Sequence, residues 1–110
     1  MRELKYRVYI PEFSKYVYFG LNDFDYSDRY LTNDEYPIQQ YTGLTDKNGK
    51  EIYEGDIIHL KFGELNDNLV VKWDKYMGLK YHNGGWTSLV HVDTHGEVIG
   101  NIFEHENLLN

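Results

Sequence analysis

The sequence contains no cysteine, which excludes disulfide bonds, thiolate metal sites and cysteine nucleophiles. It also lacks any run of about 18 apolar residues, the length that a membrane-spanning helix requires. No apolar stretch follows the opening Met-Arg-Glu-Leu-Lys-Tyr-Arg, so we expect no signal peptide. These absences favour a cytoplasmic protein without a membrane partner.

Positive charge is also scarce. The net charge is −7, and no lysine or arginine follows Lys80. A nucleic-acid binder usually has a basic face, because neutralising phosphates supplies much of its affinity. Direct binding is therefore disfavoured, although a basic cluster at Arg2, Lys5 and Arg7 keeps it open. A nucleic-acid-associated role could also take a second form, in which the acidic protein mimics the charge of nucleic acid.

The 110 residues fit one compact unit, with an N-terminal strand region at 1–36. Alternating apolar residues over 3–10 predict a half-buried strand whose apolar face holds Leu4, Tyr6, Val8 and Ile10. Its polar face, predicted to be wet, holds Glu3, Lys5, Arg7 and Tyr9. Pro11 ends this strand, and residues near 15–21 return as a hairpin partner. Residues 22–36 mix acids with aromatics and indicate a loop.

Residues 37–110 show about five short strands between Gly/Asn turns, which predicts a small β-barrel. The best turn is Asn48-Gly49, joining strands near 44 and 52, where we expect a positive φ. Further turns are predicted at Glu54-Gly55-Asp56 and at 66–68, a strand at 88–95, a strand at 98–103 and a short helical turn at 104–109. The predicted core consists of Ile58, Leu60, Leu69, Val71, Trp73, Val90, Val92 and Ile102.

Four segments, at 1–7, 40–58, 71–74 and 98–103, resemble the YopX-like family of bacteriophage and prophage proteins. The block at 40–58, from Gln-Tyr-Thr-Gly through Asp-Lys-Asn-Gly-Lys to Gly-Asp-Ile-Ile, is the most specific. The resemblance implies an SH3-like β-barrel preceded by an N-terminal strand region, in a protein of viral or prophage origin. With such an origin, the cytoplasm would be that of a host cell. The resemblance implies no reaction, catalytic residue or cofactor, and small barrels of this kind serve many unrelated roles.

Candidate sites for chemistry are weak. On the predicted strand at 88–95, His91, Asp93 and His95 would point the same way and could hold a divalent metal, but a solvated strand face explains them better. Acid pairs such as Asp23/Asp25 and Glu54/Asp56 fall in predicted turns, where exposure would keep the pKa ordinary. Asp46 and Asp56 are instead predicted to hydrogen-bond turn backbone. Residues 43–50 are neither a phosphate loop nor an EF-hand. Gly49-Lys50 is not followed by the serine or threonine of a phosphate loop, and the remaining calcium ligands of an EF-hand are missing. We therefore expect no enzyme, no cofactor and no metal.

Tyrosines crowd the N-terminal region and define a candidate protein-interaction surface: Tyr6, Tyr16, Tyr18, Tyr26 and Tyr30. The strand at 3–10 has a predicted partner on only one edge, and an unpaired edge invites pairing with another chain. The sequence thus favours a non-enzymatic interaction module that forms a homo-oligomer through its N-terminal strands and contacts a host or phage protein. The alternative is a nucleic-acid-associated protein acting in phage DNA metabolism or regulation.

Overall fold

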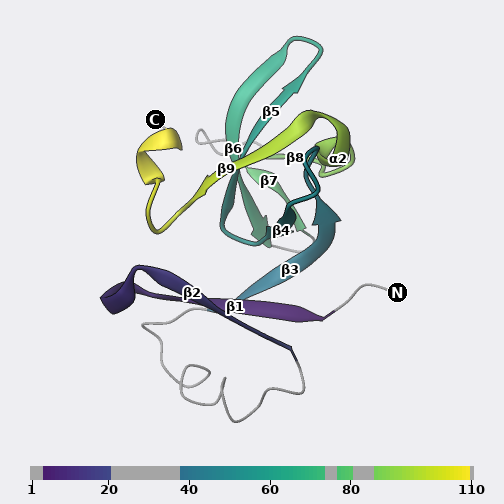
Figure 1. Cartoon of the computed structure of the whole chain (residues 1–110). Helices are drawn as coiled ribbons and strands as arrows, with labels where there is room; N and C mark the ends of the chain where they lie inside the picture. Colours follow the sequence, from purple (N-terminus) through teal and green to yellow (C-terminus); the bar gives the residue numbers. More distant parts are fainter. Residues whose placement is uncertain (1–3, 21–37, 74–76, 81–85, 110) are drawn as a thin grey trace.

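The computed structural model describes residues 4–20, 38–73, 77–80 and 86–109, with Trp73 and Met77 described by their backbone alone. Within these residues the fold is mostly β, as predicted, and its strands form two antiparallel sheets (Figure 1). The elements are β1 (Lys5–Ile10), η1 (Pro11–Phe13), β2 (Lys15–Gly20), β3 (Ile38–Thr45), β4 (Glu51–Tyr53), β5 (Asp56–Phe62), β6 (Leu65–Trp73), β7 (Met77–Lys80), β8 (Trp86–Thr87), α2 (Val92–His95), β9 (Gly96–Asn101) and η2 (Glu106–Leu109).

The first sheet has the order β2-β1-β3-β4. β1 and β2 form the predicted hairpin, in unbroken register from Lys5 opposite Gly20 to Ile10 opposite Lys15. The prediction that β1 keeps a free edge is wrong, because residues 38–40 of β3 pair with its other side. Among the described strands, the outer one on this side is therefore β2.

β3 bends in its middle and leads the chain into the second sheet. Its register against β4 shifts between Tyr41 and Thr45, and Gly43 within this shift has φ +86°. Such a bulge adds a residue to one strand and turns it. Beyond the bend, Thr45 pairs with Glu51 across the turn, where Gly49 has φ +82°. The predicted Asn-Gly hairpin turn is confirmed.

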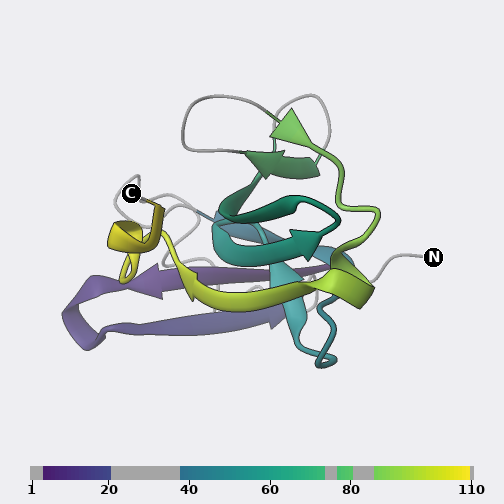
Figure 2. The same ribbon diagram turned by 90° about the horizontal axis from the view of Figure 1, so that it is seen from above.

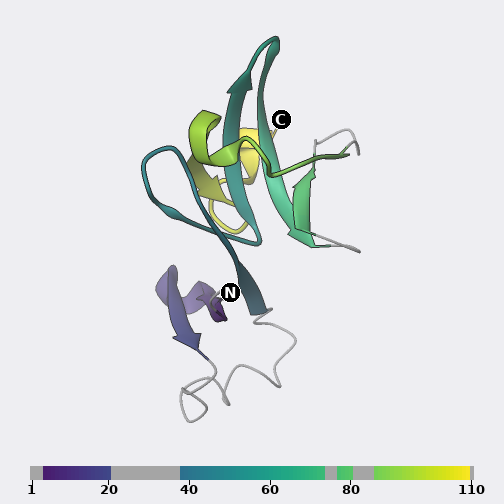
Figure 3. The same cartoon turned by 90° about the vertical axis from the view of Figure 1, so that its right-hand side faces the viewer.

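The second sheet, in the order β8-β7-β6-β5-β9, curls into a half-barrel, which is how the predicted SH3-like small β-barrel is realised (Figure 3). Its buried core consists of Ile52, Ile58, Leu60, Leu69, Val71, Leu79 and Val92. The turn predicted at 66–68 is wrong, because these residues pair with 59–61 within the β5–β6 hairpin. The chain turns earlier, where Gly63 has φ +62°.

The predicted core list is correct for five of its eight members: Ile58, Leu60, Leu69, Val71 and Val92 are buried. Val90 is 68% exposed, because the predicted strand at 88–95 is wrong and the chain forms the short helix α2 there. Ile102 is partly buried and lies just beyond β9. The Trp73 side chain lies outside the described part, so its burial stays a prediction.

The half-barrel lies over one face of the first sheet (Figures 1 and 2). The Tyr9 ring of β1 stacks on Phe103, which follows β9, with centroids 4.8 Å apart. Arg7 and Tyr9 are consequently buried, and the prediction of a wet face on β1 is wrong. The predicted C-terminal helical turn is confirmed as η2. The division at residue 36 stays a prediction, since residues 21–37 lie outside the described part.

Candidate functional site

The side chain of Arg7 joins the two sheets. It rises from β1 and is only 4% exposed. Its Nε donates to Oε1 of Gln39 on β3 at 2.8 Å, and its Nη2 donates to Oδ1 of Asp56 on β5 at 2.6 Å. Nη2 also lies 3.3 Å from the carbonyl oxygen of Glu54. One guanidinium thus connects β1, β3 and the turn between β4 and β5. We call these contacts of Arg7 with Gln39, Glu54 and Asp56 the junction.

Two tyrosine rings enclose this guanidinium. Its carbon lies 3.9 Å from the ring centroid of Tyr16 and 4.8 Å from that of Tyr53, within the range of cation–π contact. The Tyr16 hydroxyl is buried with no hydrogen-bond partner in the described part of the chain. Burial raises its pKa well above the ordinary value, and burial followed by the charge of Glu51 raises the pKa of Tyr53 to about 12. Both phenols therefore stay neutral.

Both carboxylate oxygens of Asp56 accept hydrogen bonds. Its Oδ1 accepts from Arg7, and its Oδ2 accepts from the backbone N–H of Tyr53 at 2.8 Å. The residue is 3% exposed, and burial raises the pKa of its carboxyl although Arg7 opposes this shift. The turn role predicted for Asp56 is confirmed, but its predicted exposure and ordinary pKa are wrong because the two sheets close over it.

Asp46 fastens the β3–β4 hairpin to β9. Its Oδ1 accepts from the N–H groups of Asn48 and Lys50, and its Oδ2 accepts from the N–H of Val98, each at 2.9 Å. Burial raises the pKa of Asp46, but these three hydrogen bonds outweigh it and leave the pKa below its ordinary value. The Asp-Lys-Asn-Gly-Lys part of the 40–58 block therefore has a structural role.

Gly55 occupies the tightest point of the junction. Its φ is +87°, and a Cβ built there would stand 2.0 Å from Nε2 of Gln39. Its N–H donates to the carbonyl of Val71, and its carbonyl accepts from the N–H of Ile102. Glycine is required here both by the backbone conformation and by the close approach of the Gln39 amide.

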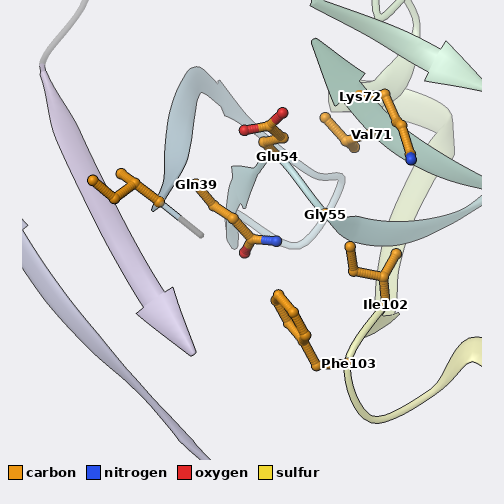
Figure 4. A pocket seen from close by; sticks show the side chains of 8 residues that line it. Gln39, Glu54, Gly55, Val71, Lys72, Ile102 and Phe103 are labelled. Carbon is orange, nitrogen blue, oxygen red and sulfur yellow. The ribbon is translucent and has the colours of Figure 1, made fainter. Parts of the chain in front are cut away.

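A pocket of about 190 Å³ opens beside this junction (Figure 4). It is lined by Ile38, Gln39, Glu54, Gly55, Val71, Lys72, Ile102 and Phe103. Gln39 reaches toward Gly55 in the middle of the view, with Phe103 below and Glu54 and Lys72 above. The walls are thus mainly apolar, with one amide and two side chains of opposite charge.

The predicted tyrosine surface is divided by the structure. Tyr6 is half-buried and stacks on Phe19, Tyr16 lies against Arg7, and Tyr18 is 57% exposed on β2. Tyr26 and Tyr30 lie outside the described residues, as does the acid pair Asp23/Asp25. Tyr18 is therefore the member available for contact.

The histidine cluster at α2 is arranged around a phenylalanine. The ring of His91 stacks on Phe62 at 4.1 Å between centroids, and the ring of His95 meets Phe62 edge-on at 4.6 Å. The hydroxyl of Thr94 lies 2.7 Å from Nδ1 of His95. Among the described residues no three histidine or acidic side chains gather as a metal ion would require.

Sequence reasoning missed Arg7 and Gln39, the two polar residues that build the junction. Arg7 looked like part of a solvated strand face, and the signal that could have marked it was its position among tyrosines at 6, 9 and 16. Both oxygens of the buried Asp56 carboxylate at the junction accept hydrogen bonds, as do both oxygens of Asp46 in the neighbouring hairpin.

The described helices include none that is both long and apolar enough to cross a bilayer. No curated protein matches the chain.

The crystal structure of protein EF1440 from Enterococcus faecalis resembles the chain over 100% of both chains, with a TM-score of 0.66 and 19% sequence identity. At this identity the likeness shows the fold alone. The family model described as YopX protein matches residues 20–110, which include Gln39, Gly55 and Asp56 but not Arg7. The chain belongs to the YopX protein family.

Proposed function

We propose that this chain is a non-enzymatic interaction module that pairs with a second copy of itself through β2. The observation that carries the proposal is the character of this outer strand. β2 has no proline and no bulge against β1, and its one charged residue, Lys15, stands at the start of the strand. Natural edge strands are usually guarded by one of these features, since an open edge is a template for another strand.

The side chains beside this edge support a protein contact. Tyr18 is 57% exposed, and its ring meets Tyr53 edge-on with centroids 5.5 Å apart. The nearby Phe13 is 70% exposed. Aromatic side chains held by their neighbours are frequent anchors of interfaces, because they bury a large area at a small entropic cost. Antiparallel pairing of two β2 strands would place Tyr18 of each copy across a two-fold axis.

The absence of enzymatic activity is part of the proposal. It is supported by Asp46 and Asp56, whose carboxylates serve the backbone and Arg7. The origin in a phage or prophage and the cytoplasmic location that the sequence favours belong to the same proposal. The nucleic-acid alternative gains no support from Arg7, because its charge is buried against Asp56.

Sedimentation velocity at micromolar concentration tests the pairing. We expect the unmodified chain to sediment as a dimer and Tyr18→Lys to sediment as a folded monomer, because lysine is a common guard of strand edges. Val90→Lys is the matched control: it adds the same charge at an apolar residue that is 68% exposed before α2, outside the first sheet, and should remain dimeric. Deleting residues 1–36 would be a poorer test, since it removes Arg7 and β1.

A monomeric unmodified chain would refute the proposal, as would a Tyr18→Lys variant that dimerises as tightly as the unmodified chain. Circular dichroism of each variant establishes that the fold is retained.

A further inference from the structure

The Gln39 amide has one donor group that the fold does not use. The residue is 4% exposed. Because Nε of Arg7 can only donate, the atom of Gln39 that it meets must be the amide oxygen, and this fixes the orientation of the amide. Nε2 therefore faces Gly55 and the pocket (Figure 4), and the described residues offer it no hydrogen-bond acceptor.

The Nε2 donor is open to the pocket rather than sealed from solvent, since the side-chain atom that is fully buried without a partner in the described part of the chain is the Tyr16 hydroxyl. Ligand pockets typically combine apolar walls with a few placed polar groups. Here the apolar walls come from Ile38, Val71, Ile102 and Phe103. The Phe103 ring is held by Tyr9, which stacks on it at 4.8 Å with 3° between the planes. The volume of about 190 Å³ exceeds the roughly 150 Å³ of an apolar cavity known to accept benzene, so a six-membered ring fits.

The charges around the pocket cancel. Arg7 is paired with Asp56 behind the wall, and Lys72 and Glu54 contribute opposite charges to the lining. A ligand with a net charge would bring an unbalanced charge into this setting, which is unfavourable. The polar groups on offer are donors from Gln39 and Lys72 and an acceptor from Glu54, a combination that suits a group with both an acceptor and a donor.

We propose that this pocket binds a small neutral carboxamide carried on a planar or branched apolar body. The amide oxygen accepts from Nε2 of Gln39, the amide N–H donates toward Glu54, and the apolar body packs on Ile102 and Phe103. This binding site is independent of the β2 edge, so it can exist whether or not the chain pairs with itself.

The test is a titration of the ¹⁵N-labelled chain with benzamide, followed by amide chemical shifts. We expect saturable shifts at the residues lining the pocket. Benzoate has the same shape but carries a charge and lacks the donor, and it should bind at least about ten-fold more weakly, the equivalent of one lost hydrogen bond and its desolvation. N-acetylphenylalaninamide extends the test to the same group within a peptide: tighter binding than benzamide would assign the site to a peptide segment, and weaker binding to a free small molecule.

Two variants tie the binding to this pocket. Gln39→Glu keeps an oxygen for Nε of Arg7 but removes the Nε2 donor, and should weaken the binding of benzamide about ten-fold. Ile102→Trp fills the pocket and should abolish binding, which keeps the proposal testable if Gln39→Glu does not fold. Lys61→Met, on the exposed part of β5, should bind as the unmodified chain does. Absence of saturable shifts with both amides, shifts outside the pocket, or benzoate binding as tight as benzamide would overturn the proposal.

Discussion

Removing the Arg7 guanidinium tests whether the two sheets depend on one buried ion pair. In Arg7→Met the side chain keeps its apolar length but leaves Asp56 buried with one remaining hydrogen bond, from the N–H of Tyr53. Breaking a buried pair by removing one partner costs about 3–5 kcal/mol. A small domain is stable by only about 5–15 kcal/mol in total, so this loss is a large fraction.

Urea unfolding followed by circular dichroism measures the loss. With a slope of about 1.5 kcal/mol per molar urea, the midpoint should fall by about 2–3 M. The exposed Lys61→Met is the control and should stay within about 0.5 kcal/mol of the unmodified chain. The double variant Arg7→Met/Asp56→Asn should recover part of the loss at pH 7, because asparagine keeps an oxygen for the Tyr53 N–H without the charge.

The loss should also depend on pH. Without Arg7, burial holds the pKa of Asp56 still further above its unfolded value of 3.8. A raised carboxyl pKa destabilises the folded chain increasingly as the pH rises above the unfolded value, and not below it. Arg7→Met should therefore lose less stability, relative to the unmodified chain, at pH 4 than at pH 7. A loss below about 1 kcal/mol, or an equal loss at both pH values, would refute the reasoning.

Two further predictions concern the block at residues 40–58. Because the pKa of Asp46 is lowered in the folded chain, its contribution to stability is present above the unfolded value of 3.8 and is lost as the pH falls through the folded value; Asp46→Asn should remove this part of the acid sensitivity, measured by urea midpoints between pH 2 and 7. Gly55→Ala should unfold the chain or cost well over 2 kcal/mol, since its Cβ would meet Gln39, whereas Gly49→Ala at a similar φ, with nothing within 4 Å, should cost only about 1–2 kcal/mol. Equal losses for the two alanine variants would show that the contact with Gln39 has no role.

Local patterns in the sequence determined much of the architecture. Alternating apolar residues identified β1, β2, β5 and the 69–73 part of β6, and the Asn-Gly pair identified the hairpin turn with Gly49 at positive φ. These features depend on interactions within a few residues, so they can be read locally. The same rules placed a strand at 88–95, but the chain forms α2 there; a short apolar run does not distinguish the two structures.

The tertiary structure alone decided the role of the polar face of β1. A period of two identifies which side chains share a face, but not what packs on that face. Arg7 became a buried cation because β3 paired beside β1 and the β4–β5 turn brought Asp56, 49 residues away, within 2.6 Å. The pocket likewise combines residues from β3, the β4–β5 turn, β6 and the segment after β9. Such contacts between distant segments form only when the sheets pack, and for that reason local sequence patterns did not predict Arg7, Gln39 or the pocket beside them.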